Sequence, residues 1–157
     1  MGVEILVAGL GNILMMDDGI GIYLCRFIKE KKKGIEIQEF GLEDWRLFSI
    51  VSNFKKVVIV DAVDMGLFPG ECTVWEDVDF VRETGFSTHN GNFASELFLA
   101  RTIKKLPENI FLFGIQPERV DCGIGLTNVL DKNFDFIAGR LMTFIEFLER
   151  GEKHALH

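Results

Sequence analysis

The chain lacks the features that mark several protein classes. It has only 3 prolines in 157 residues and no low-complexity stretch, which excludes a disordered or fibrous protein. Basic residues are in the minority, and the formal net charge of −7 argues against a nucleic acid or an anionic membrane surface as partner. No apolar run approaches the length that crosses a bilayer. What remains is globular composition, and at this length we expect residues 1–157 to form a single domain.

Cysteine is also scarce. Cys25, Cys72 and Cys122 form no CxxC pair, and any disulfide scheme would leave one of them over. We therefore expect all three to be reduced and buried, as in a cytosolic protein. The strand-like run Val3–Ala8 begins without a basic leader or a cleavage site, which also favours a cytoplasmic location.

Short β-rich apolar runs alternate with segments of helical period along the whole chain. This alternation is typical of a mainly parallel sheet with helices on both faces, so we predict an α/β fold, a three-layer α/β/α sandwich with a five-stranded twisted sheet. The predicted strands are Glu4–Ala8, Ile35–Phe40, Lys56–Val60, Glu71–Glu76 and Asn109–Phe113. The predicted helices cover residues 20–28, 45–51, 92–105 and 134–148.

The connection to the fourth predicted strand, Phe68–Gly70, is too short for a helical crossover. We expect that strand to run antiparallel to its neighbour or to lie at an edge. In an open α/β sheet, ligands bind outside the carboxyl ends of the strands, where the strand order reverses. The loops at those ends cover residues 9–19, 41–44, 61–70 and 114–125.

The first of these loops is rich in glycine, but it is not a dinucleotide-binding loop. Its sequence, GLGNILMMDDGIG, has Leu14 where the fingerprint requires a third glycine. Two adjacent carboxylates, Asp17 and Asp18, would also be badly placed beside a phosphate. The loop therefore suits cations or hydrogen-bond donors, although either aspartate could instead cap the following helix.

Two further polar residues fall near this edge of the predicted sheet. Asp61 follows the third strand directly, and His89 lies in a polar turn, STHNGN, as the only histidine outside the C-terminal tail. Helix capping and a purely structural histidine are the alternative interpretations. Two carboxylates and an imidazole suit nickel or zinc and leave coordination positions open for substrate. Because a ligating histidine is neutral, such binding should weaken as pH falls through the histidine range.

These residues resemble the motifs of a known family. The loop GNILMMDDGIG is similar to the opening motif of the [NiFe]-hydrogenase maturation endopeptidases. The segments 61–71, 87–90 and 113–118 resemble the later family motifs in the same order. The resemblance runs from the first strand to the last helix and is strongest to the branch that serves formate-hydrogenlyase-type hydrogenases.

The resemblance implies hydrolysis of one peptide bond, which releases a C-terminal extension from the hydrogenase large-subunit precursor after nickel insertion. Carried across by motif, the catalytic and metal-contacting residues are Asp18, Asp61 and His89. The substrate would carry the nickel, so we expect no tightly bound metal in the enzyme, which we expect to be a monomer. The residues expected to orient the ligands or to line the site are Asn12, Asp17, Asp64 and Gln116.

Two alternatives come from other classes of protein. A phospho-accepting receiver domain also places acidic residues after its first and third strands. Here the acidic pair lies well beyond the first strand, and the fifth strand is followed by no lysine. A non-catalytic nickel-sensing or chaperone module would use the same three ligands. That alternative stays open, because the residues by themselves display no HExxH or GxSxG protease motif.

Overall fold

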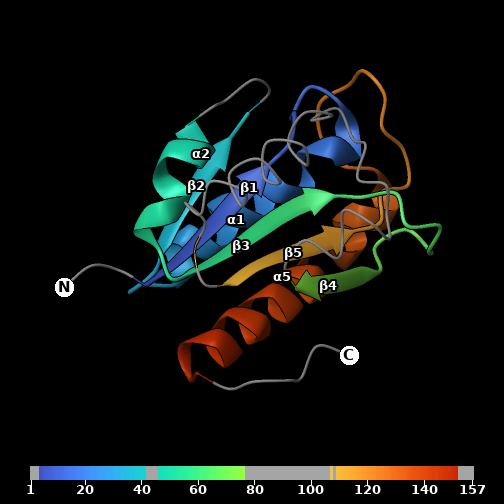
Figure 1. The fold of residues 1–157 in the computed structure, drawn as a ribbon. Coiled ribbons are helices and arrows are strands. Elements are labelled where there is room, and N and C mark those ends of the chain that lie inside the picture. The colour runs from blue at the N-terminus through green and yellow to red at the C-terminus, as the bar shows by residue number, and fades with distance from the viewer. Residues whose placement is uncertain (1–3, 42–45, 77–106, 108, 152–157) are drawn as a thin grey trace.

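The structure, a computed structural model, describes residues 4–41, 46–76, 107 and 109–151. They contain a five-stranded sheet of order β2-β1-β3-β5-β4 (Figure 1). Its strands are β1 (Ile5–Leu10), β2 (Glu36–Phe40), β3 (Lys56–Ala62), β4 (Cys72–Glu76) and β5 (Asn109–Ile115). All neighbouring pairs are parallel except β4 with β5. The mainly parallel sheet is confirmed, and β4 both runs antiparallel to its neighbour and lies at the edge.

Three strands extend further at their carboxyl ends than the sequence predicts, and the first is β1, which continues to Leu10. β3 continues to Ala62 and β5 to Ile115, because their last residues pair with each other. Asp61 pairs with Gly114 in this register. Asp61 therefore lies within the sheet and not in the loop that follows it.

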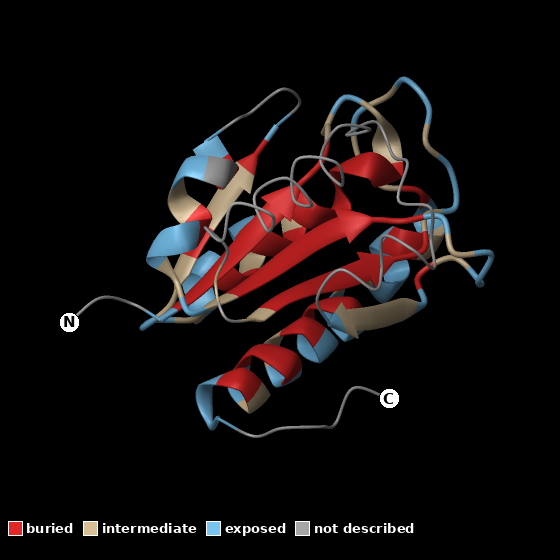
Figure 2. Ribbon diagram, in the orientation of Figure 1, coloured by how far each residue is buried: buried red, intermediate tan, exposed pale blue. Residues whose placement is uncertain are grey.

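Helices cover both faces of the sheet. α1 (Ile20–Lys31) and α5 (Asn128–Glu149) contact each other on one face. α2 (Arg46–Ile50) and the 3-10 helix η2 (Val51–Asn53) cover part of the other face. Figure 2 shows the buried side of α5 turned toward the buried strands. The three layers are confirmed, while the helix predicted over residues 92–105 lies outside the described part of the chain.

Alternation along the strands supplies both halves of the core. On β1, Val7 packs with the residues of α1 and α5, whereas Leu6 and Ala8 pack with those of α2 and η2. The five residues Val57–Asp61 of β3 are all at most 1% exposed. β3 is therefore the buried central strand that its unbroken apolar sequence predicts.

Two glycines bring α1 close to the sheet. A side chain at Gly21 would overlap the carbonyl oxygen of Val60 on β3, and its Cβ would lie 2.5 Å from the carbonyl oxygen of Leu10. A Cβ at Gly9 would lie 2.5 Å from the carbonyl oxygen of Gly21. This loop has no third fingerprint glycine at Leu14, and the close helix–strand contact is made by Gly9 and Gly21 instead.

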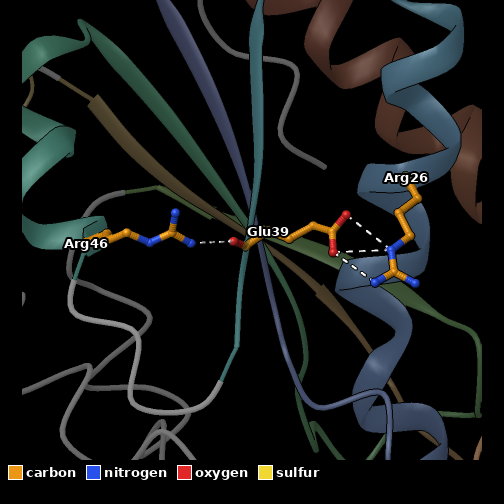
Figure 3. A network of polar contacts seen from close by, with 3 residues as sticks. All are labelled: Arg26, Glu39 and Arg46. Atoms are coloured by element: carbon orange, nitrogen blue, oxygen red, sulfur yellow. Dashed lines mark hydrogen bonds and ion pairs between the residues drawn. The ribbon is translucent and has the colours of Figure 1, made fainter.

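The edge strand β2 is held from two helices (Figure 3). Arg26 of α1 donates from Nε to both carboxylate oxygens of Glu39, each at 3.1 Å. From α2, Arg46 donates from Nη2 to the backbone oxygen of Glu39 at 3.4 Å, and its guanidinium lies 5.4 Å from the ring centroid of Phe40. Because the Arg26–Glu39 pair is solvent-exposed, it contributes at most about 1 kcal/mol.

The three cysteines are free but differ in exposure. Cys25 is buried, Cys72 is partly buried and Cys122 is exposed, so the expectation that all three are buried is wrong for Cys122. It lies on a loop at the carboxyl edge of the sheet, where no core forms around it. Loss of hydration on burial raises the pKa of Cys25 to about 12 and that of Cys72 to about 11. Neither thiol is ionised near neutral pH, so neither is a ready nucleophile.

Candidate active site

Asp18 and Asp61 lie at the carboxyl edge of the sheet, at the point where the strand order reverses. From β1 the chain passes outward to β2 and then returns to the other side of β1 to form β3. Asp18 belongs to the 3-10 helix η1 (Met16–Gly19), which follows β1 and contacts β3. Asp61 is the residue after Val60, whose partner on β1 is Gly9. This edge, beside the β1–β3 pair, is where open α/β sheets bind ligands.

Both carboxylates are buried, Asp18 at 4% and Asp61 at 1% exposure. Asp61 Oδ1 accepts a hydrogen bond from the backbone N–H of Ala62 at 2.9 Å. Burying a carboxylate costs free energy that hydrogen-bond donors or a cation must offset. Two buried carboxylates at one sheet edge supply oxygen ligands that suit a divalent cation and disfavour a phosphate or carboxylate ligand.

The loop 9–19 folds around the Asp18 carboxylate. Asp18 Oδ2 accepts from the backbone N–H of Asn12 at 3.0 Å, and Asn12 Oδ1 accepts from the N–H of Leu14 at 2.9 Å. Gly11 has a φ of +141°, and a Cβ there would overlap the carbonyl oxygen of Asp18. Asn12 therefore orders the loop that holds the Asp18 carboxylate.

The third predicted ligand, His89, lies outside the described residues. Among the residues that are described, no group of three His, Cys, Asp or Glu side chains is arranged to hold a metal ion. The trio of Asp18, Asp61 and His89 therefore stays a prediction. The structure places two of its three members at the edge of the sheet that the sequence indicated.

Asp17 is fully buried and joins two loops. Its carboxylate accepts hydrogen bonds from the backbone N–H groups of Glu118 at 2.9 Å, Arg119 at 3.0 Å and Thr127 at 2.8 Å. The hydroxyl of Thr127 is a fourth donor, 2.8 Å from Oδ2. The alternative that Asp17 or Asp18 caps α1 is wrong, because the N-cap is Gly19 and no side chain caps it. Thr127 gave no signal in the sequence, since it lies 110 residues from Asp17.

Backbone hydrogen bonds join the same two loops. The N–H of Met16 donates to the carbonyl of Gly123, and the N–H of Gly123 donates to the carbonyl of Leu14, both at 2.9 Å. The N–H of Asp17 donates to the carbonyl of Arg119 at 3.2 Å. The loop 116–127 is thus fixed alongside the loop that contains Asp18.

Gln116 organises the loop after β3. Its Oε1 accepts from the backbone N–H groups of Met65 at 2.6 Å and Leu67 at 3.2 Å. Its Nε2 donates to Asp64 Oδ1 at 3.1 Å. Asp64 itself is exposed, and its Oδ1 also accepts from the N–H of Gly66 at 3.2 Å. Gln116 Nε2 also donates to the carbonyl of Pro117 at 3.2 Å. Gln116 and Asp64 thus shape the loop 63–71.

Removing the Asp17 carboxylate should loosen the loop 116–127. In Asp17→Ala, four hydrogen-bond donors lose their acceptor. Each unsatisfied buried donor costs about 1–3 kcal/mol, but water reaches some of the four, so we expect the free energy of unfolding to fall by about 3 kcal/mol. Thr127→Val, which removes one donor and keeps the shape, should cost about 1 kcal/mol. Urea unfolding of both variants measures the difference. Equal stability of Asp17→Ala and the wild type would contradict the bridging role.

Comparisons with known proteins identify the family. Residues 23–143 match the family model described as "Hydrogenase maturation protease". The chain belongs to the hydrogenase maturation protease family. The hydrogenase expression/formation protein HupD of Rhizobium leguminosarum bv. viciae is 34% identical over 73% of this chain and 59% of that protein. The hydrogenase 2 maturation protease of Escherichia coli is 28% identical over 82% of each chain.

A solved structure of this family has the same fold. The hydrogenase maturating endopeptidase HybD from E. coli matches with a TM-score of 0.79 and 26% identity, over 94% of each chain. The match supports the order and pairing of strands described above. It also agrees with the fold that the sequence resemblance implied.

The comparisons also bear on the length of the relatives and on the branch of the family. The chain spans only about three fifths of the length of the first curated relatives that it matches. A hydrogenase 2 maturation protease is among the matches, so the predicted placement in the formate-hydrogenlyase-type branch is not singled out. What is established is the family as a whole.

No described helix is both long and apolar enough to cross a membrane.

Proposed function

We propose that this protein is an endopeptidase that removes the C-terminal extension of a [NiFe]-hydrogenase large-subunit precursor once nickel has been inserted. One observation carries the proposal: a member of this family buries Asp18 and Asp61 at the switch point of its sheet. The family supports hydrolysis of the precursor, and the burial supports a site for a cation. His89 completes the proposed trio.

Nickel enters this proposal as part of the substrate. The ion, already held by the precursor, binds Asp18, Asp61 and His89, and this contact positions the adjacent peptide bond for hydrolysis. A precursor without nickel would lack the contact that aligns its peptide bond. The enzyme then needs no resident metal, and cleavage occurs only after nickel has been inserted.

The surrounding residues hold this arrangement. Asn12 orders the loop around Asp18, and Asp17 fixes the neighbouring loop 116–127. Gln116 and Asp64 shape the loop after β3, which begins at the end of the strand that carries Asp61. These four residues act by positioning. We propose that they contact neither the nickel nor the scissile bond.

The proposal is tested by incubating the protein with nickel-loaded precursor and measuring the precursor's mass. Loss of the mass of the C-terminal extension, with no other cut, is the expected result. An unchanged mass together with stable, nickel-dependent binding would replace the peptidase by a nickel-sensing chaperone. Gel filtration of the enzyme alone tests the proposed monomer, and fractionation of the source cells tests the proposed cytoplasmic location.

A further inference from the structure

Exposed apolar side chains gather on the loops at the carboxyl edge of the sheet. Within the described residues, five large apolar side chains are strongly exposed, and four of them lie on these loops. The four, which we call the apolar rim, are Leu14, Leu67, Phe68 and Ile124. Phe68 is 80% and Ile124 is 82% exposed. Large apolar side chains that recur around a site indicate a surface that binds another molecule.

Hydrogen bonds to the backbone groups of the rim loops hold the rim residues in place. Leu14 and Ile124 lie on adjoining loops, because the carbonyl of Leu14 accepts from the N–H of Gly123. The N–H of Phe68 donates to Glu71 Oε2 at 2.9 Å, and the N–H of Leu67 donates to Gln116 Oε1 at 3.2 Å. A surface ordered before binding loses little conformational entropy when a partner docks. The loops therefore hold these side chains in exposed positions before a partner binds.

The charge around the rim indicates the chemistry of the partner. Residues 9–19, 61–71 and 116–127 contain seven carboxylates and one arginine, so most of the chain's formal charge of −7 lies in these segments. That arginine, Arg119, forms an ion pair with Asp121 at 3.0 Å. An apolar rim within a strongly negative field favours a partner segment that combines apolar side chains with positive charge.

We propose that the apolar rim docks a segment of the hydrogenase large-subunit precursor that carries apolar side chains and a net positive charge, outside the contact with nickel. This inference rests on the proposed function, because the rim residues lie on loops at the carboxyl edge, where Asp18 and Asp61 also lie. The rim supplies affinity for the precursor. The buried carboxylates then act on the segment that docking brings to them.

The chain offers a matched control for the rim. Phe136 is the fifth strongly exposed apolar side chain, at 66%, and it lies within α5 instead of on a loop. Phe68→Ser and Phe136→Ser are the same chemical change at similar exposure. Phe68→Ser and Ile124→Ser should each raise the KM for nickel-loaded precursor roughly tenfold or more with little change in kcat, as expected when a large apolar side chain is no longer buried on binding. Phe136→Ser should leave KM unchanged.

Binding of the precursor, measured separately from cleavage, distinguishes failure of this inference from failure of the proposed function. If the wild type cleaves and Phe68→Ser and Ile124→Ser match Phe136→Ser in KM, the rim is not the docking surface and the peptidase stands. If the wild type does not cleave but binds the precursor through Phe68 and Ile124, the rim stands without the peptidase. A dimer of the wild type that Phe68→Ser dissociates would assign the rim to a second copy of the chain and overturn the inference.

Raising the salt concentration should weaken precursor binding, and no response would contradict the charge argument.

Discussion

Asp61→Asn should slow release of the C-terminal extension by about 100-fold or more, the size of effect typical when a single catalytic group is removed. Asp61 is 1% exposed at the end of the central strand, where no other carboxylate of β3 can replace it. Asparagine has the same shape, and its side-chain oxygen can still accept from the N–H of Ala62. The sheet should therefore form normally, and the loss should be one of chemistry and not of folding.

The matched control is Asp135→Asn on the exposed surface of α5. It makes the same change of charge away from the carboxyl edge and should leave the cleavage rate unaltered. Circular dichroism and thermal unfolding of both variants show whether the fold is kept. Asp18→Asn should behave as Asp61→Asn does. Full activity in Asp61→Asn would remove this residue from the site.

Gly21→Ala should lower the free energy of unfolding by about 3 kcal/mol, at the upper end of the cost of overfilling a packed interior. The added Cβ would overlap the carbonyl oxygen of Val60 and press against that of Leu10. Both contacts are with backbone atoms of central strands, which cannot rotate away as a side chain can. The helix must then move off the sheet, and η1, which carries Asp18 just before it, moves as well.

Gly139 in α5 is the control for this change. A Cβ there would meet no atom within 4 Å, so Gly139→Ala should raise the free energy of unfolding by up to about 1 kcal/mol, because alanine is the better helix former. The two variants should thus change the thermal midpoint in opposite directions, with Gly21→Ala about 6–12 °C below the wild type. Equal midpoints for the two variants would contradict the close approach of α1 to β1 and β3.

The sequence predicts the sheet well because its signals are local. The apolar run Val57–Val60 identifies the central strand, and the short connection Phe68–Gly70 correctly predicts an antiparallel strand at an edge. The ends of β1, β3 and β5 are not predictable from local sequence, because they depend on pairing with strands distant in the chain, about 50 residues away for β3 and β5. Local periodicity contains no information about such pairing.

The candidate site is predictable in part for the same reason. Asp18 and Asp61 stand out because Asp18 lies in the polar loop that follows the first strand and Asp61 comes at the end of the third, and the topology brings both to one edge. The hydrogen bonds between Asp17 and the loop 116–127 are not predictable, because its partner Thr127, the N-cap residue of α5, is 110 residues away. Cys122 lies on the same loop, which is held by hydrogen bonds to residues 14–17, more than 100 residues earlier in the chain, so its exposure is not predictable from local hydrophobicity.

The most direct test of the central claim, that the site recognises nickel held by the precursor, compares nickel-loaded with nickel-free precursor. Both forms are incubated with the protein under the same conditions, and the mass of each is measured over time. The account predicts that only the nickel-loaded form loses its C-terminal extension, and that Asp61→Asn abolishes the loss. Cleavage of both forms at the same rate would contradict it.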